Sequence, residues 1–596
     1  MAPHTNYRWT YRTNGTALAP ENSGQVKKLA DELTISPVLA EILVRRNIDT
    51  FEKSKAFFRP SLDDLHDPFL CEGMHHAVER LVRAVERNER IVVYGDYDVD
   101  GTNGTALLWS FFKHLNADAE YFIPDRIKEG YGLSVASLER VREMRPNIIV
   151  SVDCGVTAVQ PVEHARTLGI DVVICDHHEP GDPLPRATAI LDPLVPACGY
   201  PFKYLCGCGV GFKLVQALLS QKSIVQRLDI DPQQLMNSFL QYVTLATLAD
   251  IVTLQGENRT LVKIGLELIN ANPLPGIFAL IESSRLKVGN ISSGQVVFVL
   301  APRINAVGRL GDAKRAVELL TCTSIDRARE LAQVLENENA QRRRIDEETF
   351  AQAQVLAEPI ASSAKVLVLH QPHWHPGVIG IVASRLVERF YRPTVMLTTV
   401  DGVAKGSARS VSGYNVYEAL RRCQSSIIQF GGHKYAAGLT VELDKVGEFR
   451  EKFQSVADEL LNDDLLTPKI QIDADIALSE LTGKFVRVLS QFAPFGPDNM
   501  RPVFATHNVE VVGTPRIVGK NHLRFKVKSN GHIVDAIGFN LGELISRVQP
   551  GQRGVSLAFS LDEGEFAGSN YPQLKIRDIK VATPQVATST NTAAAS

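Results

Sequence analysis

Acidic and histidine residues follow three short apolar segments of the chain. The segments cover residues 91–95, 147–152 and 171–175, and each is rich in Val and Ile. Continuous apolar runs of this length, separated by helical patterns, are typical of buried parallel strands. The carboxyl ends of such strands line the ligand crevice of an open α/β sheet. The side chains that would meet there are those of Asp96, Asp98, Asp100, Asp153, Asp176, His177 and His178.

Five aspartates and two histidines at one sheet edge need a compensating positive charge. Carboxylates within a few ångströms of one another raise each other's pKa values unless a cation lies between them. Carboxylate and imidazole groups together suit manganese, iron or zinc. The sequence therefore predicts a metal centre with two ions.

Two further features bear on the geometry of this centre. In an extended segment alternate side chains point the same way, so Asp96, Asp98 and Asp100 would project to one side. The alternative is a polar loop in which an Asp caps the helix that follows. Asp250 interrupts the apolar helix expected over residues 242–249. Because a buried unpaired carboxylate is costly, we expect Asp250 to bind metal or to be strongly hydrogen-bonded.

The elements that position these residues belong to a long chain of ordinary composition. Its 596 residues, 44% hydrophobic and 22% charged, indicate a globular protein of several domains. No apolar run reaches the roughly 18 residues that a membrane span needs, so we expect no membrane association. Eight cysteines without a CxxC pair, and no secretory leader in residues 1–8, predict a cytoplasmic protein.

Cys206-Gly207-Cys208, with Cys198 upstream, raises the alternative of a zinc site. The spacing matches no common structural zinc pattern, and the neighbouring glycines suit a tight turn. We therefore favour the turn.

The predicted fold class is α/β, with a parallel-sheet domain, a long helix, a smaller α/β domain and a C-terminal β-barrel. Strand and helix patterns alternate from residue 91 to about 320, which is typical of βαβ units. Residues 324 to about 356 contain no Gly or Pro and should form one long helix. The expected parts are a helical lead-in (1–85), the parallel-sheet domain (86–323), the connector helix (324–360), the smaller α/β domain (361–464), the barrel (465–582) and a disordered tail (583–596).

The barrel segment carries a second, independent signal. Residues 501–580 hold 11 Lys or Arg against 7 Asp or Glu, an excess of +4 in a chain whose net charge is −3. Within 520–528, apolar residues alternate with basic ones, which predicts a strand with one buried and one positive face. The alternative is a solvated sheet surface without a ligand. The basic residues of this strand that we expect to bind nucleic acid are Arg524, Lys526 and Lys528.

Four motifs occur in an order that resembles the DHH phosphoesterase superfamily. They are GDYDVDGT (95–102), SVDCG (151–155), CDHHEP (175–180) and TLADIVTL (247–254). The resemblance extends over about residues 35–580, and further segments are similar to those of the RecJ exonuclease family. These segments are IPDR (123–126), EGYGL (129–133), PRINAVGRL (302–310), HWHPGVIG (373–380), GGH (431–433) and AAG (436–438).

The resemblance implies a ligand set for two manganese or magnesium ions. It makes Asp98 a ligand of the first ion and Asp153 the bridge, with Asp96 contributing to or supporting the first site. The ligands of the second ion would be Asp100, His177 and Asp250. Several superfamily members have a histidine ligand where this chain has Tyr94. This departure predicts a first site that binds more weakly, with an occupancy that depends on substrate or on manganese concentration.

The resemblance also implies catalytic roles beside the metal ions. Asp176 would orient its neighbour histidine from behind the ligands, and His178 would face the scissile phosphate. Together with Asp153 these are the expected catalytic residues. The alternative for His178 is that it only packs or hydrogen-bonds next to a ligand.

Arginines beside glycine-rich turns are the expected phosphate contacts, because a guanidinium and backbone N–H groups can hold an anion together. The alternative for any single arginine is a solvated side chain or a weak salt bridge. The expected contacts outside the barrel are Arg126, Tyr131, Arg303, Arg309, Ser407, Arg409 and His433.

The resemblance implies a single-strand-specific 5′→3′ exonuclease that hydrolyses DNA to 5′-mononucleotides and serves recombination and repair. The implied partners are single-stranded DNA, a single-strand-binding protein and a helicase, with a monomeric enzyme and a barrel of the OB-fold type. One alternative is a DHH phosphodiesterase or pyrophosphatase for small substrates, which would not need a basic barrel. The other is a catalytically silent scaffold, against which the complete set of expected ligands argues.

Overall fold

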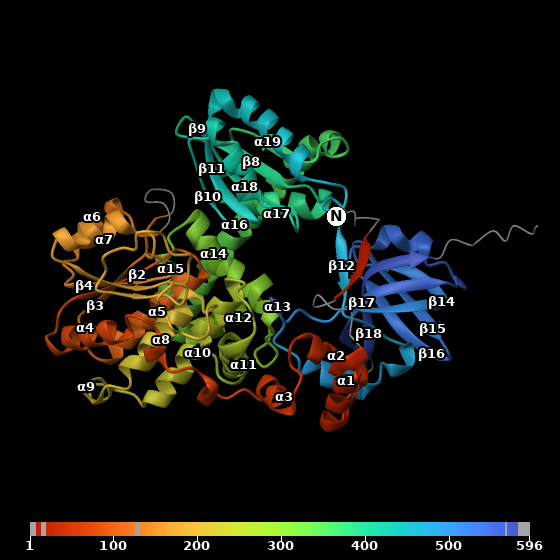
Figure 1. The fold of residues 1–596 in the computed structure, drawn as a ribbon, viewed down its shortest axis with the longest axis horizontal. Coiled ribbons are helices and arrows are strands. Elements are labelled where there is room, and N and C mark those ends of the chain that lie inside the picture. Colours follow the sequence, from red (N-terminus) through yellow and green to blue (C-terminus); the bar gives the residue numbers. More distant parts are fainter. Residues whose placement is uncertain (1–6, 13–19, 126–131, 567–568, 582–596) are drawn as a thin grey trace, which may run out of the picture.

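The computed structural model describes residues 7–12, 20–125, 132–566 and 569–581. It confirms the α/β class, the two α/β domains and the C-terminal barrel (Figure 1). The first domain and the barrel lie on opposite sides of the molecule, and the smaller α/β domain lies above them in this view. The expected tail from residue 583 lies outside the described residues, as do Arg126 and Tyr131.

The first domain is built on a five-stranded parallel sheet of order β3-β2-β4-β5-β6. The two central strands β2 and β4 have every residue buried, as expected for apolar runs covered by helices on both faces. The strands are β2 (Ile91–Gly95), β3 (Ala119–Phe122), β4 (Ile148–Val152), β5 (Asp171–Cys175) and β6 (Ala189–Leu191).

Helices surround this sheet and extend it into a large helical body. They are α4 (Met74–Glu86), α5 (Val99–His114), α6 (Val135–Glu143), α7 (Val159–Thr167), α8 (Gly207–Leu218), α9 (Lys222–Val225), α10 (Pro232–Ala249), α11 (Gly256–Ala271), α12 (Pro275–Ser283), α13 (Ser293–Gln295), the π-helical turn η3 (Val296–Leu300), α14 (Ala301–Leu310) and α15 (Lys314–Leu320). Within the described residues no single helix is long and apolar enough to cross a membrane, and α11 with α12 forms one bent pair that meets the length and composition test together.

The connector α16 (Ile325–Ala361) joins the two α/β domains and is 37 residues long. Ser324 caps its first turn by accepting a hydrogen bond from the Arg327 N–H, as expected for an N-cap serine. The helix continues past the predicted end near residue 356 and includes Pro359. Pro359 lies in the last turn of the helix and removes one of its backbone hydrogen bonds.

The smaller domain has a mixed sheet of order β10-β11-β9-β8-β7, in which only β7 and β8 are parallel. Its strands are β7 (Leu367–His370), β8 (Thr394–Val400), β9 (Val403–Arg409), β10 (Gln429–Gly432) and β11 (Ala436–Glu442). Its helices are α17 (Ile379–Phe390), α18 (Val416–Arg422), η4 (Gln424–Ser426), η5 (Leu443–Lys445) and α19 (Val446–Leu460).

The C-terminal domain is a five-stranded barrel that the β14–β17 pairing closes. Its strands are β14 (Phe504–Val518), β15 (His522–Ser529), β16 (His532–Gly538), β17 (Val555–Phe566) and β18 (Ser569–Val581), preceded by β12 (Lys469–Ile472), β13 (Ala474–Asp475), η6 (Leu478–Glu480) and α20 (Gly483–Ser490), with η7 (Gly542–Arg547) between β16 and β17.

The N-terminal segment differs from the helical lead-in that the sequence suggested. β1 (Arg8–Tyr11) is a strand and pairs in parallel with β12. The helices α1 (Pro20–Leu33), α2 (Pro37–Arg45) and α3 (Phe51–Phe58) share a hydrophobic core with the barrel, whereas α4 packs with the first sheet. Two short turns, η1 (Leu62–Asp64) and η2 (Pro68–Leu70), connect α3 to α4. The amphipathic pattern indicated helices but not which core they join, because that core lies more than 400 residues away in sequence.

Candidate metal centre and nucleic-acid interface

The three acidic motifs meet at the carboxyl edge of the first sheet. Gly95, Val152 and Cys175 are aligned across β2, β4 and β5, so the aspartates that follow them start from neighbouring positions. β2 lies between β3 and β4 in the sheet. The chain therefore adds β3 on one side of β2 and then β4 on the other, so the strand order reverses between β2 and β4. Ligand sites in open α/β sheets lie at such reversals. The site is therefore where the sequence analysis expected it.

Two groups of side chains each bring three ligand atoms within 4.8 Å of one another around Asp153. Asp96, Asp98 and Asp153 form one group, and His177 and His178 form another with Asp153. A third group, Asp100, His177 and Asp250, adjoins them. The His177 Nε2 atom lies 3.1 Å from Asp153 Oδ1 and 3.7 Å from both Asp100 Oδ2 and Asp250 Oδ2. All six expected metal ligands are thus brought together.

One feature of the predicted geometry is wrong. Residues 96–100 are not one extended segment, because helix α5 begins at Val99 and Asp98 caps it by accepting a hydrogen bond from Gly101 N–H. Asp98 and Asp96 therefore lie with Asp153, whereas Asp100 leaves the first turn of α5 toward His177 and Asp250. Asp98 therefore caps the helix, as the alternative predicted, and also belongs to an acidic group. Both are possible because a carboxylate has two oxygen atoms.

Asp100 is held by the start of helix α8. Its two carboxylate oxygens accept hydrogen bonds from Gly207 N–H (2.6 Å) and Cys208 N–H (2.8 Å). Free N–H groups and the positive end of the helix dipole stabilise a carboxylate at this place. The cysteines of this segment start a helix and belong to none of the ligand groups found among the described residues. The tight turn expected at these residues is wrong, because Gly207 and Cys208 begin helix α8, and sequence reasoning missed their role in holding Asp100.

Asp153 has a strained backbone. Its φ of 63° lies in the left-handed region, which costs a non-glycine residue of order 1 kcal/mol or more. Helix α8 also packs directly against it, because a Cβ at Gly207 would lie 2.7 Å from both Cα and Cβ of Asp153. Only glycine fits there. The fold therefore keeps the central carboxylate in an unfavourable conformation, which is typical of functional sites.

The electrostatics of this cluster test whether a divalent cation fits. Burial and the charges of Asp100 and Asp98 raise the pKa of Asp153 well above its usual range. Burial, Asp100 and Asp98 also raise the pKa of Asp250 to about 9. Carboxylates in this arrangement hold protons unless a cation neutralises them. A set of carboxylate oxygens with one imidazole matches what manganese and magnesium accept, so the residues present fit these ions.

Asp176 lies behind the ligands and orients a histidine ring. Its Oδ1 atom lies 2.7 Å from Nδ1 of His178, and the same carboxylate accepts backbone N–H groups from Val156 and His177. The ring that it fixes is that of His178, whereas only the backbone of His177 contacts it. Burial opposes protonation of His178, but the hydrogen bond to Asp176 and the negative charges of Asp176, Asp250 and Asp100 together raise the pKa of His178 to about 9.

Tyr94 lies in the hydrophobic core. Its hydroxyl donates to the Gly132 carbonyl and is also 2.9 Å from Ser137 Oγ, and its ring stacks on Phe122. The side chain therefore faces a core away from the acidic groups. The first group contains only carboxylates: Asp96, Asp98 and Asp153.

Ser407 and Arg409 lie against the start of helix α17. A Cβ at Gly380 would be 2.9 Å from both Ser407 Oγ and Arg409 Nη2, so the serine and guanidinium cover the first turn of that helix. On the other side, Arg409 pairs with Ala436, whose carbonyl accepts the His433 N–H. Ser407 and Arg409 thus meet at the start of α17, and the His433 backbone lies in the neighbouring turn between β10 and β11. A helix start with a guanidinium beside it favours an anion.

Arg303 and Arg309 lie on helix α14 and contact other parts of the chain. Arg303 is 7% exposed, pairs with Glu336 of α16 and donates to the Val299 carbonyl. Arg309 donates to the Gly377 carbonyl at the edge of the smaller domain. Both arginines connect α14 to neighbouring segments. For Arg303 the structure shows the alternative, a salt bridge.

The barrel strand β15 has the two faces that the sequence predicted. Leu523, Phe525 and Val527 are buried, whereas Lys526 and Lys528 are exposed and Arg524 is half-buried. Asp535 on β16 lies 3.7 Å from Arg524 and 3.8 Å from Lys526. A hollow of about 520 Å³ opens between this face and Arg516. Strand β15 therefore has a basic face, and Asp535 neutralises part of its charge.

Comparison with known proteins gives the same division. Models of the DHH family N-terminal domain, the DHHA1 domain and the RecJ OB domain match residues 90–247, 363–459 and 472–578. The single-stranded-DNA-specific exonuclease RecJ of Bacillus subtilis is 36% identical over 94% of this chain and 70% of its own length. That of Escherichia coli is 36% identical over 85% and 90%. The crystal structure of RecJ with Mn²⁺ from Thermus thermophilus superposes with a TM-score of 0.81 at 29% identity, covering 97% of this chain and 80% of that one.

Proposed function

Because this chain belongs to the RecJ family of DHH phosphoesterases, we propose that it is a single-stranded-DNA-specific 5′→3′ exonuclease. It is a metal-dependent hydrolase that releases 5′-mononucleotides. Its place in the cell is DNA recombination and repair. The observation that carries the proposal is the convergence of Asp96, Asp98, Asp100, Asp153, His177 and Asp250 in adjoining groups around one sheet edge.

The residues present would hold two Mn²⁺ or Mg²⁺ ions. Asp98 and Asp96 would bind the first ion, and Asp153, which belongs to two of the ligand groups, would bridge the two. The second ion would take Asp100, His177 and Asp250. When bound, such a pair of ions activates water and neutralises charge at the phosphate. The chain supplies the fixed positions: the α8 N–H groups orient Asp100, and the strained backbone presents Asp153.

His178 would contact the scissile phosphate. Its Nδ1 lies 2.7 Å from Asp176 Oδ1, which fixes the orientation of the ring. The contact with Asp176 favours the protonated form of the ring, whose pKa is raised to about 9. A positive donor there would bind the phosphate oxygen and stabilise the charge that develops on it. Asp176 acts through His178 and is a positioning residue.

The 5′ end of the strand would bind at the smaller domain. Ser407, Arg409 and His433, with the first turn of α17, would form an anion site that suits a terminal phosphate. Arg126, Tyr131 and Arg309 would also contact the strand, whereas Arg303 is held by Glu336 and the Val299 carbonyl and would act only by positioning α14. Arg524, Lys526 and Lys528 on the barrel would then hold the strand backbone further along.

We also propose the cellular setting and the division of the chain. The enzyme would act in the cytoplasm as a monomer, together with a single-strand-binding protein and a helicase that supplies unpaired ends. The domain limits would be 86–323, 361–464 and 465–582, with the connector helix over 324–360.

The test is hydrolysis of a single strand labelled at its 3′ end, compared with the matching blunt duplex, in manganese. We expect progressive shortening of the single strand from its 5′ end and no attack on the duplex. Asp153→Ala should abolish shortening. Tight strand binding without cleavage would replace the proposal with the scaffold alternative, and cleavage of only the shortest oligonucleotides would favour a small-substrate phosphodiesterase.

A further inference from the structure

Two buried cysteines from distant parts of the first domain face each other. Cys71 lies between η2 and α4, and Cys198 lies in the segment between β6 and α8. Their sulfur atoms are 3.8 Å apart, which is within hydrogen-bonding distance for sulfur, and each residue is 6% exposed. The two residues are 127 positions apart in the sequence. The fold therefore brings together two thiols that no sequence motif joins.

The backbones on either side of the pair are also in contact. Beside Cys198, a Cβ at Gly199 would lie 3.7 Å from the Leu70 carbonyl oxygen. Beside the other cysteine, a Cβ at Gly73 would lie 2.8 Å from the carbonyl oxygen of Ile190 in β6. Because the two segments are packed on the same part of the domain, joining the sulfur atoms requires movement of side chains more than of the domain.

Hydrogen-bonding groups and a positive charge surround Cys198. The Lys203 ammonium donates to the Cys198 carbonyl at 2.7 Å, which places its charge beside this cysteine. The hydrogen bond with Cys71 lowers the pKa of Cys198. Two backbone N–H groups, those of Tyr200 and Glu72, and the Lys203 charge lower this pKa further, against the effect of burial. The same hydrogen bond and burial raise the pKa of Cys71, so Cys198 is the thiolate of the pair and Cys71 the thiol.

The pair lies directly beneath the protein surface. Ala197 and Gly199, on either side of Cys198, are exposed, and so is Glu72 beside Cys71. A small oxidant therefore has a short path to the Cys198 sulfur, whereas the side chain of another protein does not fit. Paired cysteines in proteins of a reducing compartment are typically transient and sense oxidants.

We propose that this pair is a peroxide-reactive site, in which Cys198 reacts with a hydroperoxide and Cys71 then closes a disulfide bond. In the first step the Cys198 sulfur attacks one oxygen of hydrogen peroxide, the O–O bond breaks, hydroxide leaves and Cys198 becomes a sulfenic acid. In the second step the Cys71 sulfur attacks the Cys198 sulfur, and its thiol proton leaves with the sulfenic hydroxyl group as water. A thiol reductant reverses the modification. The inference does not depend on the proposed exonuclease activity.

The second step protects the domain from a buried charge. A sulfenic acid that meets no thiol is oxidised further to a sulfinate, which does not revert. At Cys198 this charge would lie in the core, where the Asp192 carboxylate interacts electrostatically with both thiols. A disulfide bond is neutral, and it links segments 127 positions apart. We therefore expect the disulfide form to unfold at a higher Tm than the reduced form.

The experiment is treatment of the full chain with hydrogen peroxide in a chelating buffer, followed by thiol counting in denaturant and mapping of the modified peptides. We expect two fewer free thiols than the eight of the reduced chain, a peptide pair joined through Cys71 and Cys198, and full reversal by dithiothreitol. Cys322, the one cysteine of the eight that is not buried, should be oxidised at least about tenfold more slowly.

Two variants separate the two steps. Cys71→Ser removes the thiol that closes the disulfide bond, so peroxide should convert Cys198 to a sulfinate and lower the Tm of the treated chain. Cys198→Ser removes the reactive sulfur, so peroxide should change neither its thiol count nor its Tm. Both variants are compared with their own untreated forms, which corrects for the substitution itself.

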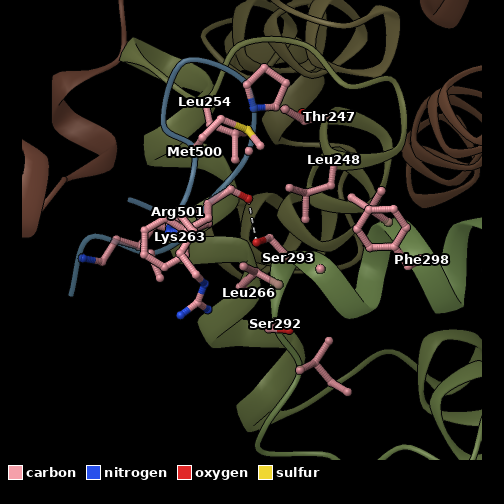
Figure 2. Close-up of a pocket in the computed structure, with 18 of the residues that line it drawn as sticks. Thr247, Leu248, Leu254, Lys263, Leu266, Ser292, Ser293, Phe298, Met500 and Arg501 are labelled. Atoms are coloured by element: carbon pink, nitrogen blue, oxygen red, sulfur yellow. Dashed lines mark hydrogen bonds between the residues drawn. The ribbon is translucent and has the colours of Figure 1, made fainter. Parts of the chain in front are cut away.

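An exposed methionine is the control for other oxidation. Met500 lies in an apolar hollow of about 750 Å³ between the end of α10, η3 and the segment before β14 (Figure 2). It is 55% exposed, so peroxide oxidises its thioether to a sulfoxide. Met500→Leu removes this reaction and should give the same thiol count and the same change in Tm as the native chain.

Several outcomes would overturn the inference. They are a native chain that keeps eight free thiols, a sulfinate at Cys198 without a bond to Cys71, and a Tm of the native chain that falls on treatment. A Cys71→Ser chain whose Tm does not respond to peroxide would overturn the protective role. None of these measurements uses DNA, so their failure leaves the proposed function intact, and failure of the exonuclease assay leaves this site intact.

Discussion

The metal centre and the basic face of the barrel hold their functional side chains in opposite ways. Asp100 and Asp153 are at most 3% exposed, and backbone groups of α8 fix the first and crowd the second. Lys526 and Lys528 stand in solvent on a strand whose other face is core. A buried charge that loses its partners is costly, whereas a solvated charge contributes little alone. Single changes should therefore abolish function in the first region and only weaken it in the second.

The largest expected effect comes from Gly207→Ala. A methyl group there would lie 2.7 Å from Asp153 Cα, and neither that backbone nor α8 can move without disturbing Asp100. We expect kcat to fall to about a thousandth of the native value or less. The free energy of unfolding should decrease by about 1–3 kcal/mol. Kinetics and thermal denaturation measure the two effects. Gly211→Ala on the same helix, where a Cβ meets only ordinary contacts of 3.6 Å or more, is the matched control.

A smaller loss should follow Asp176→Asn. The amide keeps the shape of the side chain but removes the charge that holds the His178 ring at 2.7 Å and raises its pKa. We expect kcat to fall about 10- to 100-fold, as for other residues behind a ligand set. The pH at which activity declines on the alkaline side should move down, because His178 would lose its proton at a lower pH. An unchanged pH profile would remove His178 from the proposed role.

Arg409→Ala should change the preference for 5′-phosphorylated strands more than it changes kcat. The guanidinium at the start of α17 suits a terminal phosphate, so its loss should reduce the advantage of 5′-phosphorylated over 5′-hydroxyl strands about tenfold. Comparing kcat/KM on the two substrates measures it. If the ratio stays at the native value, the 5′ end binds elsewhere.

The smallest effects belong to the barrel. Lys526→Ala and Lys528→Ala should each weaken strand binding only a few-fold and reduce the slope of log K against log salt by about 0.7. Lys484→Ala, an exposed lysine on α20, is the control. Equilibrium binding of single-stranded DNA at several salt concentrations distinguishes the two barrel variants from this control. A loss of cleavage as complete as that of Gly207→Ala would break the contrast between the two regions.

The same contrast explains what the sequence could predict. Strand ends and alternating faces depend on neighbouring residues, so the site edge in β2, β4 and β5 and the two faces of β15 were predictable. Contacts between distant segments were not. The α8 N–H groups on Asp100 join residues more than 100 positions apart. The packing of α3 on the barrel also escaped prediction for the same reason.

A local error has a local cause. Residues 96–100 read as extended because aspartates alternate, yet Asp98 also caps a helix, and capping ended the extension at Val99. The alternation and the cap predict different directions for Asp100, and the start of α5 at Val99 gives it the direction that the cap predicts. Similarly, the sequence marked Tyr94 as a departure from a ligand pattern, and the structure adds that its hydroxyl is already bonded to Gly132 and Ser137.

The most direct test of the account is the number of manganese ions that each chain binds at equilibrium, measured together with exonuclease activity. We expect two ions for the native chain, one for Asp250→Asn with little activity, and loss of affinity at both sites for Asp153→Asn. A native chain that is fully active with a single bound ion would contradict the central claim that Asp153 joins two metal sites.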